Sequence, residues 1–142
     1  MVAARGHPRR RRAISGTRVR IDPFATEGTD GNWIVRWRIT NASDQPIQLV
    51  TAVQPHSQFR TPETKVDREI APGTAIDVAL PVKFTESPGA IVENPFLILR
   101  MREDHEWLVL ARVRVTAGSR GEPVAGRSVV VTTRKIEDPS PD

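Results

Sequence analysis

The sequence contains neither cysteine nor tyrosine, and its only lysines are Lys65, Lys83 and Lys135. Without cysteine, the chain can form no disulfide, no zinc–thiolate site and no thiol nucleophile. No apolar run approaches the ~18 residues that a membrane-spanning helix requires. The 142 residues fit a single domain, which at this size buries enough surface to fold without a disulfide or a metal.

The N-terminus is basic but lacks the apolar stretch of a signal peptide, because Arg18, Arg20 and Asp22 interrupt the region where it would lie. We therefore expect no cleavable export signal and a cytoplasmic location. The preference for arginine over lysine is typical of a GC-rich coding genome and suggests a bacterial source.

The basic charge of the chain is concentrated at its start. The net charge of +4 includes five arginines within the first twelve residues, which leaves −1 for residues 13–142. A block of arginines binds polyanions through phosphate contacts, so Arg9, Arg10, Arg11 and Arg12 are candidate polyanion contacts. Two alternatives remain open: a disordered tail without function, or an extension that arises from a misassigned start codon.

Alternating apolar and polar residues dominate the rest of the chain and predict β-strands with one inward face. Trp33, Val35, Trp37 and Ile39 alternate with polar residues after a turn signal at Asp30-Gly31. Similar patterns, separated by turn signals, predict about eight strands and no helix. We expect them near residues 17–22, 33–40, 47–53, 64–70, 76–84, 94–100, 107–115 and 129–131.

Short strands at this spacing are typical of an antiparallel β-sandwich. The segments Asn41–Ile47 and Pro72–Val82 resemble the bacterial immunoglobulin-like and fibronectin-like sandwich superfold over about residues 14–134. The resemblance implies an immunoglobulin-like sandwich of about seven or eight strands and a tendency towards binding functions, and it transfers no site residue. We expect disordered tails at residues 1–13 and 135–142, with the sandwich domain at residues 14–134.

A search for catalytic and metal sites finds no convincing candidate. Ser57 adjoins His56, but neighbours on an extended chain point in opposite directions, and the chain has no Gly-x-Ser-x-Gly or phosphate-binding loop. The carboxylates and histidine of Glu103–Glu106 are better explained as a solvated hairpin tip than as a metal site. We therefore predict neither an enzyme nor a cofactor.

Arginines on the outward side of the predicted strands are candidate partner contacts: Arg36, Arg38, Arg112 and Arg114. If their strands are neighbours, they form a basic stripe that can hold carboxylates or phosphates. The alternative is that Asp67, Glu69 and Asp77 pair with them as solvated ion pairs of little net energy.

The three tryptophans fall on the inward side of their strands and are expected in the core. Phe59 has no obvious inward position, and Pro55–Arg60 reads as an irregular connector. Loops on a rigid scaffold commonly carry function, so His56, Phe59 and Arg60 are further candidate partner contacts. The favoured function is a non-catalytic module that binds another protein. The alternative is a polyanion or nucleic-acid binder that uses the arginine-rich tail, with weak contacts to nucleic acid, together with the outward arginines of the strands. Self-association through an exposed edge strand is a further possibility.

Overall fold

The computed structural model describes residues 18–136, and these contain strands but no helix. All strand pairs are antiparallel, in an eight-stranded sheet and a three-stranded sheet. The strands are β1 (Val19–Thr29), β2 (Asn32–Asn41), β3 (Ile47–His56), β4 (Phe59–Ile70), β5 (Ala75–Lys83), β6 (Ile91–Val92), β7 (Phe96–Arg102), β8 (Glu106–Arg112), β9 (Val115–Ala117), β10 (Pro123–Ala125) and β11 (Val130–Lys135).

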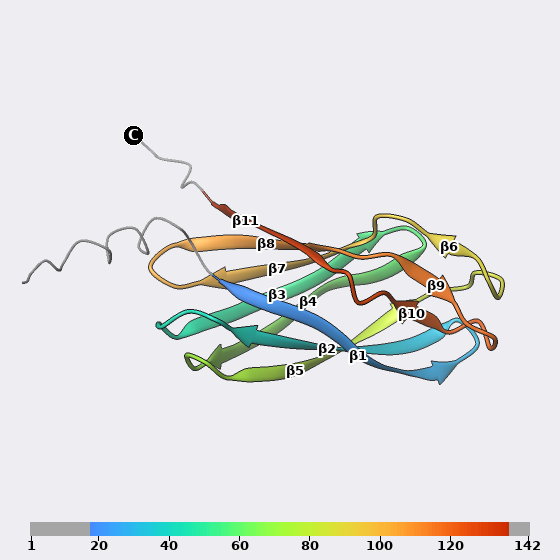
Figure 1. Ribbon diagram of the computed structural model, residues 1–142, viewed down its shortest axis with the longest axis horizontal. Coiled ribbons are helices and arrows are strands. Elements are labelled where there is room, and N and C mark those ends of the chain that lie inside the picture. The colour runs from blue at the N-terminus through green and yellow to red at the C-terminus, as the bar shows by residue number, and fades with distance from the viewer. Residues whose placement is uncertain (1–17, 137–142) are drawn as a thin grey trace, which may run out of the picture.

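The larger sheet runs in the order β1-β2-β5-β4-β3-β7-β8-β11 and curves into an open half-barrel (Figure 1). Its two halves join where β5 meets β4, through the single residue pair Arg60–Lys83. The smaller sheet has the order β10-β9-β6. Because β4 and β5 barely pair, the sheet can fold over on itself along this line.

The core lies between the two halves of the larger sheet. Buried residues of β1, β2 and β5 belong to one cluster with buried residues of β3, β7 and β8. The tryptophans lie inward as predicted, with Trp33 and Trp37 3% and 0% exposed and Trp107 8% exposed. The in–out alternation thus positions most of the core correctly.

The predicted turn at Asp30-Gly31 is confirmed, and both residues have positive φ, 41° and 83°. Pro81 of β5 lacks an N–H and cannot donate a hydrogen bond to a neighbouring strand. Its carbonyl oxygen points towards β4 and accepts a hydrogen bond from Thr61 Oγ1 at 2.7 Å. In a strand, the N–H and C=O groups of one residue point to the same side. The missing N–H of Pro81 would therefore also point towards β4, with which β5 forms a single residue pair.

Two expectations about elements are wrong, and three features of the strands were not anticipated. The strand expected over residues 107–115 is two strands, β8 and β9, in different sheets, and the short β6 and β10 were not anticipated. Pro55–Arg60 is no irregular connector, because β3 and β4 turn tightly at Ser57–Gln58. Val53 points outward because a bulge between Leu49 and Thr51 shifts the alternation.

The C-terminal boundary also differs from the expectation. Lys135 belongs to β11, and the N–H of Ile136 donates to the carbonyl of Glu106 at 2.9 Å. β11 therefore includes Lys135, and Ile136 is hydrogen-bonded to the sheet, although both residues were assigned to the C-terminal tail. The predicted basic tail at residues 1–13 lies outside the described residues.

Candidate binding surface

The outer face, defined here as the side of β3, β7, β8 and β11 that points away from the core, carries a row of apolar side chains. Val53, Ile98 and Leu110 are consecutive cross-strand partners, and Thr132 of β11 continues the row. The three apolar side chains are half-buried and are not among the partly buried residues that pack against the core. They therefore cover one another on a surface that faces solvent.

Arginines lie in the rows on both sides of this apolar row. One neighbouring row pairs Arg100, Leu108 and Arg134, and the other pairs Phe96, Arg112 and Val130. Val130 is 48% exposed. An apolar centre with a charged, solvent-exposed rim is the arrangement of a protein-binding surface.

Glu106 neutralises part of this charge. Its Oε1 accepts a hydrogen bond from Arg100 at 3.2 Å, and its Oε2 accepts one from Arg102 at 2.7 Å. The hydrogen bond from Arg102 is the main reason that the pKa of Glu106 lies below its usual value. Arg112 and Arg134 form no ion pair with any residue in the range 18–136.

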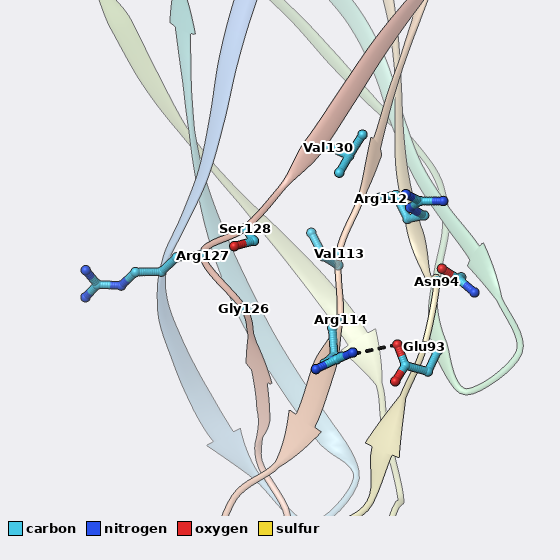
Figure 2. Close-up of a pocket in the computed structure, with 9 residues that line it drawn as sticks. All are labelled: Glu93, Asn94, Arg112, Val113, Arg114, Gly126, Arg127, Ser128 and Val130. Atoms are coloured by element: carbon cyan, nitrogen blue, oxygen red, sulfur yellow. Dashed lines mark hydrogen bonds and ion pairs between the residues drawn. The ribbon is translucent and has the colours of Figure 1, made fainter.

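A groove of about 560 Å³ lies at the end of the outer face, where three neighbouring chain segments leave the sheet (Figure 2). Between the pairs Arg112–Val130 and Val115–Ala125, one segment has two residues and its partner has four. The unequal lengths separate the segments and open the groove. It is lined by Glu93, Asn94, Arg112, Val113, Arg114, Gly126, Arg127, Ser128 and Val130.

The arginines of the groove point in different directions. Figure 2 shows Arg112 and Arg127 on opposite sides, with Val113 and Ser128 between them. Arg114 Nε lies 3.2 Å from Glu93 Oε1, in an ion pair whose side chains are 63% and 55% exposed. Within the described part of the chain, Arg127 has no acidic partner. The groove is thus basic along its rim and does not focus charge on one point.

The expected arginine set separates into two groups. Arg36 and Arg38 lie on β2, which four strands separate from β8 in the sheet order. They pair with Glu27 and with Asp77, at 3.0 Å and 2.9 Å. Asp77 was among the acids expected to neutralise the arginines, and the hydrogen bond from Arg38 is the main reason that its pKa is low. The expectation of one basic stripe that joins β2 to β8 is therefore wrong.

The expected contacts at residues 56–60 change as well. Phe59 is 1% exposed and packs edge-on against Phe84, with ring centroids 6.2 Å apart. Its assignment to a contact surface is wrong, because the short turn brings it into β4 with its ring inward. His56 is half-buried, and its Nδ1 accepts a hydrogen bond from the N–H of Gln58 at 3.1 Å. Arg60 is exposed.

Among residues 18–136, no three histidine or acidic side chains gather into a group that could hold a metal ion. At the tip that includes Glu103–Glu106, Glu106 is held by two arginines. The described segment also offers no helix of the length and apolarity needed to cross a bilayer. Arg9–Arg12, the candidate polyanion contacts, lie outside the described residues.

Sequence reasoning missed the apolar row and, apart from Arg112 and Arg114, the residues that line the groove, including Glu93, Asn94 and Arg127. Leu108 and Leu110 already fell on the outward side of the predicted strand, beside Arg112 and Arg114. Two leucines at positions predicted to face solvent were the available signal for an exposed apolar patch. Nothing in the sequence marked the separation of strands that forms the groove, because it depends on unequal segment lengths in the folded sheet.

Comparison with known proteins gives no relative: no family model, no curated protein and no solved structure matches the chain.

Proposed function

We propose that this protein is a non-catalytic interaction module of the immunoglobulin-like or fibronectin-like sandwich class, and that it binds another protein over its outer face. The observation that carries the proposal is the apolar row of Val53, Ile98 and Leu110 between two rows of arginines. Contiguous apolar surface with a polar rim marks interaction sites on soluble domains.

The strand order supports the sandwich assignment. The set β1-β2-β5 corresponds to strands A, B and E of the immunoglobulin fold, and β4-β3-β7-β8 corresponds to C′, C, F and G. The two sets share one core and meet at a single residue pair. β11 adds a strand beside the G-like β8.

The surface chemistry favours binding over catalysis. The lowered pKa values of Asp77 and Glu106 arise chiefly from arginine partners, and that of Glu122 arises from backbone N–H donors. These are the charge partners of a stable surface. An acid or base prepared for catalysis is instead commonly perturbed by burial within a cleft.

The test compares two charge insertions on opposite halves of the sheet. Leu110→Asp disrupts the apolar row, and Ile34→Asp places the same charge on the exposed side of β2, where Ile34 is 37% exposed. Each change costs about 1 kcal/mol of strand preference, and Leu110→Asp also loses the apolar contacts of a half-buried side chain, so thermal unfolding is measured to establish that both variants remain folded at the assay temperature. Proteins cross-linked to the full chain in its native cells are then quantified for wild type and both variants, and each candidate is purified for a direct binding measurement.

We expect a partner whose direct binding is lost with Leu110→Asp and kept with Ile34→Asp. Equal binding to all three proteins would overturn the proposal.

A further inference from the structure

We propose that the partner is acidic, and that its carboxylate side chains bind the arginines of the groove while its apolar side chains cover Ile98 and Leu110. This inference rests on the proposed function, because it names the chemistry of the protein that occupies the outer face.

The groove and the apolar row form one continuous surface. Arg112 is the cross-strand partner of Phe96 and Val130, in the row next to Ile98 and Leu110. The same arginine and Val130 line the groove. A segment that lies on the apolar row therefore reaches the groove without leaving the protein surface.

The charges of the groove favour carboxylates over cations. Arg112 and Arg127 have no acidic partner within residues 18–136, and Glu93 is the single acid that lines the groove. Guanidinium groups bind carboxylates in a planar, two-point geometry. Because Arg112 and Arg127 point to opposite sides (Figure 2), the groove suits several carboxylates spaced along a chain better than one small anion.

The outer face is poorly suited to pairing with a second copy of itself. The outward sides of β7, β8 and β11 carry Arg100, Arg102, Arg112 and Arg134 against the single acid Glu106. A two-fold contact would bring these like charges together, which disfavours association.

The same surface is poorly suited to single-stranded nucleic acid. Binders of that class stack bases on exposed aromatic rings. The described tryptophans are buried, the outer face carries one half-buried phenylalanine, Phe96, and the most exposed phenylalanine, Phe24, lies on β1 with the Arg38 guanidinium 4.6 Å from its ring centroid. The aliphatic side chains of Ile98 and Leu110 match apolar side chains of a protein instead.

The test uses a random peptide library displayed on phage and selected on the immobilised full chain. We expect the enriched peptides to combine apolar residues with several Asp or Glu residues. One enriched peptide is then synthesised, and its Kd is measured at low and high NaCl for wild type and for defined variants. Affinity for an acidic peptide falls as salt screens the arginines.

The direction in which Glu93→Gln changes the affinity for the peptide is the decisive result. The change frees Arg114 from its exposed ion pair, so we expect the acidic peptide to bind roughly two- to fivefold more tightly, the effect of an exposed pair of this kind. Glu27→Gln is the matched control, because it frees Arg36 of β2 from a glutamate of β1 that is as exposed as Glu93, and it should leave Kd unchanged. Arg112→Gln should weaken binding by roughly tenfold, the loss of one hydrogen bond to a charged group.

The variants separate the two proposals. If Leu110→Asp abolishes peptide binding while Glu93→Gln and Arg112→Gln change nothing, the interaction face stands and the acidic partner is wrong. If the peptide binds Leu110→Asp as well as wild type, the proposed function fails with it. Weaker binding to Glu93→Gln also overturns the inference. The inference is also overturned if single-stranded oligothymidylate displaces the peptide and itself binds more tightly to Glu93→Gln, because that result assigns the groove to nucleic acid.

Discussion

Glu106 holds two arginines of the outer face, and this arrangement predicts how stability depends on pH. Its pKa is lowered in the folded protein, chiefly by the hydrogen bond from Arg102. A lowered folded pKa adds stability that is present above the unfolded pKa of about 4.3 and is lost as the pH falls through the folded value.

We therefore expect wild type to exceed Glu106→Gln in stability at neutral pH, and this advantage to shrink steadily below about pH 4.3. Urea unfolding of both proteins between neutral and strongly acidic pH measures the difference. An advantage that stays constant into acid would show that the carboxylate charge does not contribute.

Phe59 shows which properties of a single residue can be predicted from the sequence and which cannot. Its hydrophobicity is evident, but its direction depends on a tight turn that the pattern Pro55–Arg60 does not announce. Arg38 and Asp77 were easier, because each lies within a long, regular alternation, and their strands β2 and β5 pair without a register shift. The alternation of apolar and polar residues predicts whether a side chain points inward or outward only where the backbone forms a regular strand.

Truncation of Phe59 should be costly. The side chain is 1% exposed and contacts Phe84 edge-on, so Phe59→Ala should lower the free energy of unfolding by about 3–5 kcal/mol. Arg60→Ala, at the exposed neighbouring position, should change it by no more than about 0.5 kcal/mol. Chemical denaturation of the two variants checks this contrast, and equal effects would contradict the burial of Phe59.

At the scale of elements, the β1–β2 hairpin depends on Gly28. Its φ is +129°, and an added Cβ would lie 2.5 Å from the carbonyl oxygen of Asn32 and 2.9 Å from Trp33 Cα. Gly73 also has a positive φ, +73°, but an added Cβ meets no atom within 4 Å.

Gly28→Ala should therefore destabilise the protein more than Gly73→Ala. Both variants strain a positive φ, at about 1–2 kcal/mol, and only the first forces two backbones apart. Thermal unfolding gives the comparison, and amide hydrogen exchange should localise the Gly28→Ala effect to β1 and β2. Equal melting temperatures would refute the close approach at Gly28.

The sequence predicts elements well where pairing is regular and poorly where the sheet is interrupted. The alternation in β2 and β5 holds along their whole length, because nine consecutive residue pairs join them. In β3 it fails after the bulge at Leu49 and Thr51. The alternation runs on through Val113 and Arg114, yet there the chain passes from one sheet to the other.

At the scale of the whole molecule, the two halves of the larger sheet are held together by more than one backbone pair. Gln54 Nε2 donates to Thr61 Oγ1 at 2.6 Å, and Thr61 Oγ1 donates to the carbonyl of Pro81 at 2.7 Å. Arg68 Nη1 also crosses to the carbonyl of Asp77 at 3.0 Å. The order of strands across this junction could not be predicted, since it depends on contacts between residues far apart in the chain.

Removal of the Thr61 hydroxyl should weaken this junction. Thr61→Val leaves the buried Gln54 amide without its acceptor, and we expect a loss of about 1–3 kcal/mol. Adding Gln54→Met should restore part of it, because the unpaired amide is then absent. Thr64→Val, which removes an exposed bond to the Pro62 carbonyl, should be nearly neutral. Urea unfolding of wild type, Thr61→Val, Gln54→Met, the double variant and Thr64→Val measures the coupling, and additive losses at Gln54 and Thr61 would contradict the network.

The two ends of the chain differ in how far each strand is from its partner along the sequence. Residues 106–135 contain both sides of one interrupted hairpin, in which β8 and β9 face β11 and β10. β2 instead meets β5 only after the chain has passed through β3 and β4. Closing long loops is slow compared with zipping a hairpin from its turn. The rate at which this protein refolds should therefore be limited by the meeting of β2 and β5, with the C-terminal hairpin already formed.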